Sequence, residues 1–594
     1  GKFRDSLNRL VKLFPYKQRG GTTGGEIAAG LCMGLLSVCG IFMNLQLLAQ
    51  YQISGPAVTV TAAELAANGE AFAQMYFVSM LVSFAGSLLI GLAAHLPLVQ
   101  VSSLGLSAVL VSLVGIGTGL TYYNLLFLCF VSSVIYAAIL AIPGGYGFLV
   151  GTLPAGVRKA LPAAAGLLLA GVAAQLSGVF PVKASSIPVY GAGSVLEASE
   201  ANVALSGFVS FDNYSYLTDK YHPTMLVCAV SVLVAIVIYL LRRRSNRPCL
   251  TALLGGTVVF LLGSVLLTCV NWKNMTMSFD SMWARLWTVG SEDSMQLHLS
   301  TVLKNLSIGA VFTQGMDFTA YTEAGGNVIR LFATGILTNL LLNLYDADTT
   351  LTVVAAESSV AETSHRLPLL CNAAINVVAP IVGAGPVAIG KESVAGARDH
   401  AKSGLASVVA AIVMLVSAFV WAVPFFLATI TSYDVTFNMY GHYGTVLQYM
   451  TECSFSVADI VMVLVGLGMA IHSAGLEWSD LNQSVPFVAT VAGTLLTSNL
   501  AVGAAAGLVA FVLVNLSKAP VVYDFEEYEE EEESEAEDEG AAEAAADDAE
   551  AETGDGGEED IILPEKEPGL LEKVGVKTLI LAAICLMLLI LTVL

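Results

Sequence analysis

The sequence predicts an all-α polytopic membrane protein with about fourteen transmembrane segments. The chain of 594 residues is 56% hydrophobic and only 12% charged, with a mean hydropathy of +0.74, whereas soluble domains carry about 25% charged residues. Apolar runs recur along the chain, and many are close to the roughly 20 residues that a membrane-spanning helix needs. Two of these runs are interrupted by glycine, proline and polar residues at matching places in the two halves. These three observations exclude an ordinary soluble domain.

The apolar runs and the residues that break them form two sets of seven. The first set lies at 25–49, 72–94, 103–117, 122–143, 158–177, 224–241 and 248–270. The second set lies at 328–345, 367–383, 389–400, 404–428, 456–473, 485–516 and 575–593. The run 485–516 is longer than one span requires and is interrupted by the tripeptide TSN.

Basic clusters orient the predicted spans. The segment 1–20 is basic and amphipathic, and we expect a short helix on the inner membrane surface, anchored by Lys12, Lys17 and Arg19. The clusters at 158–159 and 242–247 fall on the same side, which the positive-inside rule places in the cytoplasm. The loops 178–223 and 271–300 then lie outside. Because the number of spans is even, both termini of this inner- or plasma-membrane protein are expected in the cytoplasm.

One segment accounts for the net charge of −22. Residues Tyr523–Asp560 hold 21 of the 48 acidic residues and no Lys or Arg, which leaves 27 acids against 26 basic residues elsewhere. A block of like charges repels itself and stays disordered. We expect a solvated cytoplasmic loop there, with cation buffering or partner docking as alternatives.

The nine cysteines lie mostly inside apolar runs and show no CxxC or Cys/His spacing. They are therefore expected to be small buried hydrophobic residues. The sequence indicates no metal site, no cofactor and no nucleic-acid partner. It also shows no nucleophile–base pair at membrane depth, so we do not expect an enzyme.

The two interrupted segments point to a binding site. They read HLPLVQVSSLGLS at 95–107 and VGAGPVAIGKES at 382–393. Paired interrupted spans in corresponding positions of two halves are typical of transporter sites, and unwound backbone at membrane depth is tolerated only where it is buried or lines a cavity. Each interruption also leaves the start of a short helix, whose free N–H groups can receive a polar or anionic ligand. Ordinary kinks at proline and glycine are the alternative.

Ionisable residues near these segments are candidates for the site. Asp346 and Asp348 follow the apolar run 328–345 and, two positions apart on a helix, point in different directions; a charge in the headgroup region is the alternative for either. Glu392 follows the second interruption. A carboxylate at membrane depth suits a proton path and can accept a hydrogen bond when ionised or donate one when protonated. Lys391 points about 100° away from Glu392, and it can neutralise an acid, stand in for a bound cation or reach water.

Five segments, in order, resemble the AzgA-like hypoxanthine/guanine/adenine permease branch of the nucleobase/ascorbate transporter superfamily. The likeness runs from about residue 21 to 517 and resumes at the last span. The segments are TTGGEIAAGLCMGLLSVCGIFMN, TLPAGVRKALPAAAGLLLAGVAAQLSG, LYDADTTLTVVA, GKESVAGARDHAKSGL and LEWSDLNQSVPFVATVAGTLLTSNLAVGAAAGL. The third is similar to the family pattern F-D-T-x-G-T-L, and the fourth to I-E-S-x-x-G-V.

The resemblance implies a 7+7 inverted repeat in which a core domain slides against a gate domain, with two short strands at broken spans 3 and 10, near 99–102 and 386–388. It assigns substrate binding and proton coupling to Asp346 and Glu392. It implies pocket positions at Ser102, Ser103, Ser107, Val387 and Ala388. Further candidates for the pocket are Asn44, Asp348, Thr349 and Lys391. It also implies an elevator-type importer of a purine with H⁺, as a possible homodimer through the gate domain.

The implied division of the chain follows the spans. The core domain takes 21–150 and 328–430, and the gate domain takes 151–275 and 431–520. The remaining parts are the amphipathic N-terminus 1–20, an outer connection 276–327, the acidic loop 521–570 and a last transmembrane helix 571–594.

Departures from the family pattern touch the pocket and leave the substrate open. The hydrophobic residue before the glutamate is Lys391 here, the third-span Asn is Ser107, and the Thr and Gly after the eighth-span Asp are Ala347 and Thr349. A small organic or inorganic anion is therefore the second candidate ligand, since Lys391 could serve a carboxylate. Sodium stays open as the coupling ion, because carboxylates and unwound carbonyls also bind it.

Overall fold

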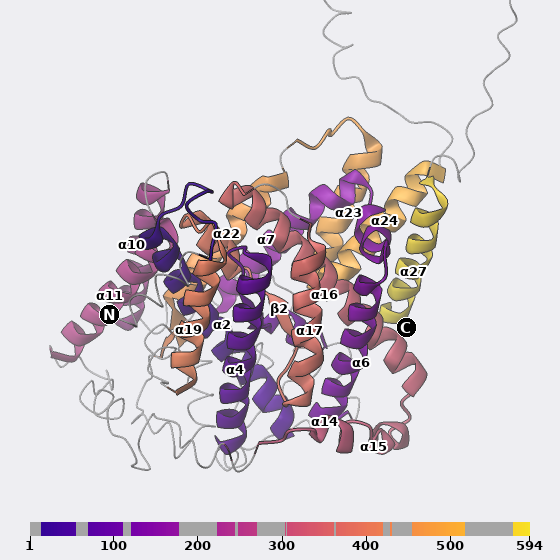
Figure 1. Ribbon diagram of the computed structural model, residues 1–594, viewed down its shortest axis with the longest axis horizontal. Helices are drawn as coiled ribbons and strands as arrows, with labels where there is room; N and C mark the ends of the chain where they lie inside the picture. The colour runs from indigo at the N-terminus through magenta and orange to yellow at the C-terminus, as the bar shows by residue number, and fades with distance from the viewer. Residues whose placement is uncertain are drawn as a thin grey trace, which may run out of the picture.

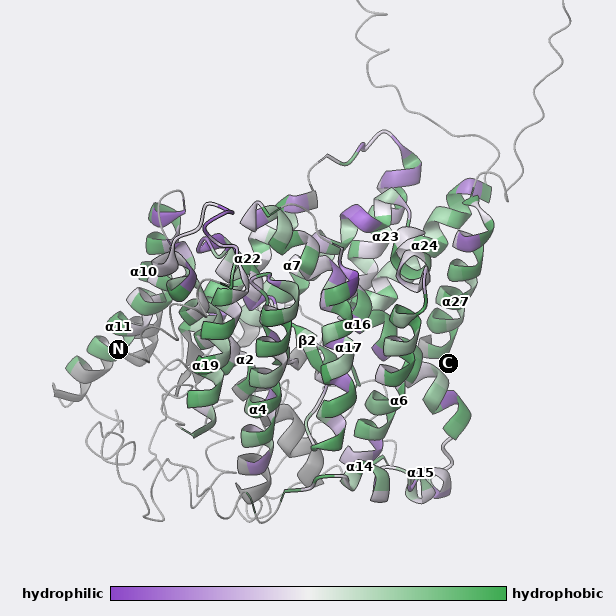
Figure 2. Cartoon of the chain, viewed as in Figure 1, coloured by the Kyte–Doolittle hydropathy of each residue, from purple (hydrophilic) through white to green (hydrophobic). Residues whose placement is uncertain are grey.

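The structure, a computed structural model, describes residues 13–54, 69–110, 120–176, 223–243, 247–269, 303, 306–360, 364–419, 428–430, 454–473, 475–516 and 574–593. The acidic loop 521–570, the outer loop 271–300, nearly all of the outer loop 178–223 and most of the amphipathic N-terminus lie outside these residues. Within the described residues, five helices are long and apolar enough to cross a membrane, and seven shorter apolar helices accompany them. The chain is a multi-pass membrane protein, and Figure 2 shows hydrophobic residues along the helices and hydrophilic ones toward their ends.

The first half of the chain contains the helices α2 (Thr23–Ser54), α4 (Gly69–Ala94), α5 (Leu104–Leu110), α6 (Tyr122–Ala141), α7 (Ala155–Leu176), α10 (Pro223–Arg242) and α11 (Pro248–Cys269). The strand β1 (Gln100–Ser102) precedes α5, and a short π-helix, η2 (Gly147–Gly151), precedes α7. Two short helices, α14 (Ala310–Thr313) and α15 (Thr319–Glu323), connect to the second half.

The second half contains α16 (Val328–Ser358), α17 (Arg366–Ile381), α18 (Glu392–Arg398), α19 (Gly404–Phe419), α22 (Val457–Ala470), α23 (Leu481–Thr497) and α24 (Leu500–Leu516). The strand β2 (Val387–Ile389) precedes α18, as β1 precedes α5, and the one-turn 3₁₀ helix η5 (Ile471–Ser473) follows α22. A second strand pair, β3 (Ala428–Ile430) with β4 (Ser454–Ser456), was not expected from the sequence. The helix α27 (Val576–Val593) follows.

The helix contacts repeat between the two halves, as an inverted repeat requires. α4 of the first half packs against α19 of the second, and α17, the counterpart of α4, packs against α6, the counterpart of α19. In the same way α10 packs against α11 in the first half, and α23 packs against α24 in the second. α7 packs against its own counterpart α22, and β1 pairs antiparallel with β2. The predicted fold class, an all-α bundle with two short strands at broken helices, is therefore confirmed.

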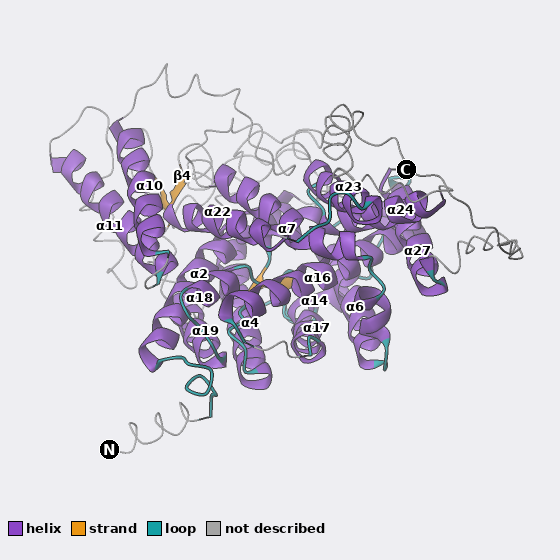
Figure 3. Ribbon diagram, turned by 90° about the horizontal axis from the view of Figure 1, so that it is seen from above, coloured by secondary structure: helices purple, strands orange, loops and turns teal. Residues whose placement is uncertain are grey.

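The helices form two groups, seen from above in Figure 3. The core group consists of α2, α4, α5, α6, α16, α17, α18 and α19 with β1 and β2, which pack mainly on one another. The gate group consists of α7, α10, α11, α22, α23 and α24. The contacts that join the two groups involve chiefly α2, α16 and α18 of the core.

One predicted span is two helices. The run 485–516 was expected to be a single overlong span, but Ser498 takes a left-handed conformation with φ of 52° and ends α23. Asn499 then caps α24, because its Oδ1 accepts the N–H of Ala501 at 3.0 Å. The second set of seven is thus complete at α24, and α27 is an additional helix rather than the fourteenth. The cytoplasmic position of both termini stays a prediction.

Candidate functional site

The two interrupted segments meet within the core group, and Figure 1 labels one of their strands, β2, near the middle of the molecule. β1 and β2 pair antiparallel, with Val101 opposite Ala388 and Ser102 opposite Val387. The pairing is extended at both ends, because the N–H of Ser103 donates to the Pro386 carbonyl at 3.0 Å and the N–H of Gly390 donates to the Val99 carbonyl at 2.9 Å. The starts of α5 and α18 therefore lie on either side of one strand crossing.

Serine hydroxyls satisfy the backbone of β1 on the side that β2 does not cover. The Oγ of Ser87 on α4 accepts the N–H of Gln100 at 2.9 Å and donates to its carbonyl at 3.0 Å. Three further hydroxyls accept backbone N–H groups of this segment, from Leu98, Val99 and Ser102; they belong to Ser407, Ser393 and Ser83. Non-helical backbone at membrane depth needs such partners, because no lipid group can supply them.

Asparagine side chains of α17 do the same for β2. The Oδ1 of Asn376 accepts the N–H of Val387 at 2.9 Å, and its Nδ2 donates to the Val387 carbonyl at 2.6 Å. Asn372 Nδ2 donates to the same carbonyl and to Oε1 of the buried Gln100. These contacts tie α17 to both strands. The sequence did not predict these contacts, because an Asn in an apolar helix carries no local signal that identifies its hydrogen-bond partner.

Lys391 forms an ion pair with Asp346 of α16, although Glu392 is its neighbour in the chain. Glu392 opens α18, and its side chain is buried, with only 8% of the residue exposed. Gly40 of α2 lies against its carboxylate, since a Cβ added there would lie 3.1 Å from Glu392 Oε1. The structure thus brings Asp346, Lys391 and Glu392 together at the end of the strand crossing. Of the three roles that the sequence left open for Lys391, the ion pair corresponds to the first, the neutralisation of an acid.

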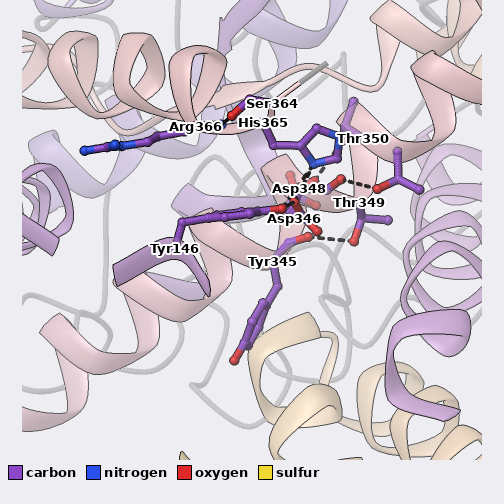
Figure 4. Close-up of polar contacts among 10 residues, drawn as sticks. Tyr146, Tyr345, Asp346, Asp348, Thr349, Thr350, Ser364, His365 and Arg366 are labelled. Atoms are coloured by element: carbon purple, nitrogen blue, oxygen red, sulfur yellow. Dashed lines mark hydrogen bonds and ion pairs between the residues drawn. The ribbon is translucent and has the colours of Figure 1, made fainter. Parts of the chain in front are cut away.

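Asp348 points away from this group. Its Oδ1 accepts the hydroxyl of Tyr146 at 2.8 Å and lies 2.7 Å from Nδ1 of His365 (Figure 4). Residues two apart on a helix differ by about 200°, which explains why Asp346 and Asp348 serve different places. Asp348 fastens α16 to the segment before η2 and to the start of α17, so it does not line the strand crossing. Thr349 also turns inward, with its hydroxyl bonded to the Tyr345 carbonyl at 2.6 Å.

The remaining predicted pocket residues lie at the crossing but differ in what they offer. Ser102 Oγ accepts a hydrogen bond from Asn44 Nδ2 at 2.8 Å, and Ser103 Oγ caps α5 by accepting the N–H of Leu106 at 3.2 Å. Ser107 is fully buried, and its hydroxyl has no hydrogen-bond partner within the described part of the chain. Val387 and Ala388 contribute backbone in β2, and the Val387 N–H and carbonyl are already bonded to Asn376.

Two residues of α16 were missed. Asn339 and Asn343 are buried, with 3% and 2% exposed, and the Oδ1 of each has no hydrogen-bond partner among the described residues. They stand seven and three positions before Asp346, which places all three on one helix face. The spacing i, i+4, i+7 of polar residues in an apolar run was the signal that could have found them. Within the described ranges, no group of three or more His, Cys, Asp or Glu residues could hold a metal ion.

No protein-family model and no curated protein matches the sequence. Among solved structures, SLC26A9 is similar at 12% identity and a TM-score of 0.44, over 83% of this chain and 65% of that one. The murine Solute Carrier 26 family member A9 anion transporter in the inward-facing state is similar at 13% identity and 0.42, over 86% and 72%. The transmembrane domain of BicA, a cyanobacterium bicarbonate transporter, gives 14% and 0.37, over 76% and 97%. The AzgA-like resemblance stays a prediction, and the fold rests on the packing described above.

Replacing Ser87 by alanine should destabilise the core group. The change leaves both the N–H and the carbonyl of Gln100 without their side-chain partner in a buried strand, which costs about 1–3 kcal/mol. Thermal unfolding of purified protein in detergent measures the loss. Ser417→Ala is the matched control, because among the described residues the Ser417 hydroxyl donates only to the Val413 carbonyl of its own helix. Such a bond to the preceding turn does not stabilise a helix, so the control should have a small effect. Equal effects of the two changes would contradict the role given to Ser87.

A double-mutant cycle should detect the Lys391–Asp346 pair. Lys391→Met leaves a carboxylate beside the strand crossing without its partner, and Asp346→Asn leaves an ammonium, so each change alone should lower the unfolding temperature. The double variant should recover part of the loss, with a coupling of about 0.5–3 kcal/mol. The same cycle with Lys391→Met and Asp348→Asn should be additive, because Asp348 pairs with Tyr146 and His365 instead. Additivity in the first cycle would show that the pair does not form.

Proposed function

We propose that the protein is a secondary active transporter that imports a nucleobase, with hypoxanthine, guanine or adenine as the first candidates, by proton symport. The observation that carries the proposal is the position of Glu392. Its carboxylate is buried at the crossing of two broken helices, and the neighbouring lysine is bound to another acid. A buried carboxylate at membrane depth that is not matched to its neighbouring cation needs a proton or a ligand as its partner.

Glu392 has the chemistry that a purine requires. An ionised carboxylate accepts hydrogen bonds from ring N–H groups, and a protonated one donates to ring nitrogens or carbonyls. The core group also holds buried amide and hydroxyl oxygens that have no hydrogen-bond partner among the described residues, on α2, α5 and α16: Asn44, Ser107, Asn339 and Asn343. An unbonded buried polar atom costs about 1–3 kcal/mol, so a ligand that bonds to them recovers this free energy on binding.

Asp346 is expected to act through an exchange of partners. In this conformation the ammonium of Lys391 forms an ion pair with it. A ligand or proton that takes over one member of the pair changes the charge of the site, which couples occupancy to the movement of the core. The division into core and gate groups is compatible with an elevator-type movement, in which the strand crossing travels with the core.

A small organic or inorganic anion is the second candidate, and Lys391 is the reason. A ligand carboxylate could replace Asp346 as the partner of its ammonium. Glu392 opposes this alternative, because an anion beside an ionised carboxylate is repelled unless the carboxylate first takes up a proton. Assembly as a homodimer through the gate group stays an expectation of the resemblance.

Uptake of labelled hypoxanthine, guanine and adenine in a host without purine permeases tests the proposal. We expect saturable uptake that a protonophore abolishes, and a loss of about tenfold or more in Glu392→Gln, the effect of losing a hydrogen bond to a charged group. Glu26→Gln is the matched control, because Glu26 is a fully buried carboxylate that accepts the N–H groups of Lys402 and Ser403 at the start of α19.

Membrane expression of every variant is measured alongside. Absence of purine uptake by a well-expressed wild type would reject the nucleobase. Uptake of a labelled small carboxylate, lost in Lys391→Ile, would then establish the anion alternative.

A further inference from the structure

The short helix α18 carries a charged residue at each end. Glu392, its first residue, lies at the strand crossing, and Arg398, its last, lies at the opposite end with Asp399 directly after it. Seven residues at about 1.5 Å each span only about 10 Å, so a rigid helix of this length moves both ends together. Contacts of the charged groups at its far end can therefore restrain the position of the strand crossing.

Arg398 joins the core group to the gate group. Its Nε donates to Glu357 Oε1 of the core helix α16 at 2.9 Å. Its Nη1 donates across the boundary to the hydroxyl of Tyr239 on α10 at 3.0 Å and to the Leu464 carbonyl on α22 at 3.2 Å. The gate helix makes room for this side chain, because a Cβ at Gly468 of α22 would collide with the guanidinium group.

Asp399 makes a second connection across the same boundary. The residue is fully buried, and its two carboxylate oxygens accept the N–H groups of Cys249 and Leu250, each at 2.8 Å. These N–H groups belong to the first turn of α11, which has no partners for them within its own helix. A carboxylate of the core thus caps a helix of the gate.

His472 completes the cluster. It lies in η5 directly after α22, and its Nε2 is 3.1 Å from the same Glu357 oxygen that Arg398 contacts. Glu357 is therefore held between a core arginine and a gate histidine. Hydrogen bonds with a charged partner are about twice as strong as neutral ones, and they are directional, so sliding of the two groups past each other breaks all of these contacts at once.

We propose that Arg398, Asp399, Glu357 and His472 form a latch that holds the core against the gate in the present conformation, and that the latch must open for the core to move. The link to transport rests on the proposed function, whereas the latch itself is a statement about two helix groups. Because the latch sits on the helix that begins with Glu392, a change of partner at that carboxylate can be transmitted to the latch through one rigid element.

The reactivity of Cys249 tests the latch without any substrate. Its residue is fully buried in the closed latch, so the thiol should react with a maleimide only when α11 separates from Asp399. Full-length protein in nanodiscs is labelled over time, and the modified Cys249 peptide is quantified by mass spectrometry. We expect Asp399→Asn and Arg398→Gln to speed labelling of Cys249 by about tenfold or more, the effect of losing hydrogen bonds to charged groups. Arg398→Lys, which keeps the charge and loses the planar fork, should give an intermediate rate.

Glu26→Gln is again the control, since this carboxylate also accepts backbone N–H groups at the start of a helix but lies wholly within the core group. It should leave the labelling rate unchanged. Wild-type labelling rates in both Asp399→Asn and Arg398→Gln would overturn the latch, and so would an equal acceleration by Glu26→Gln, which would indicate general loosening. The labelling experiment uses no ligand, so its result does not depend on the purine uptake assay. If the variants speed labelling as expected but the wild type takes up no purine, the latch stands and the proposed function fails.

Discussion

The structure depends on satisfying the backbone of two short strands inside a membrane protein. A helix bonds its own N–H and C=O groups, but β1 and β2 have only each other on one side, and lipid supplies no partners for the other. The core group solves this with serine hydroxyls of α4, α18 and α19 around β1 and with two asparagines of α17 around β2. The polar residues of these otherwise apolar helices are therefore distributed according to where the broken segments need partners.

The same constraint places the ionisable groups. Because α18 starts where β2 ends, Lys391 and Glu392 are held at the strand crossing, and α16 passes close enough for Asp346 to pair with Lys391. The pairing neutralises one acid and leaves the other, Glu392, as the carboxylate whose partner is not a neighbouring cation. A carboxylate in this position can take up a proton or accept a hydrogen bond from a ligand N–H.

The inverted repeat organises the contacts within and between the two groups. Equivalent helices pack in equivalent ways in the two halves. The strand crossing pairs one strand from each half, so it lies where the two repeats meet. The contacts of the core with the gate include charged residues at the end of α18, whose hydrogen bonds are strong but few. The helix α27 lies outside the repeat and packs on both α24 and α16, hence on both groups.

The sequence by itself determined the class of the fold, because hydropathy, turn residues and basic clusters are local signals. It located both broken segments and the separation of Asp346 from Asp348, which follows from helical geometry alone. It did not reveal that Lys391 chooses an acid 45 positions away over the one beside it. It also missed the serine and asparagine partners of the strands and the cap that Asp399 places on α11. It marked the interruption of 485–516 at TSN but counted the run as one span, whereas the structure has two helices there. These features are hydrogen bonds between groups far apart in the chain or a single left-handed residue, and only the packing of the helices decides them.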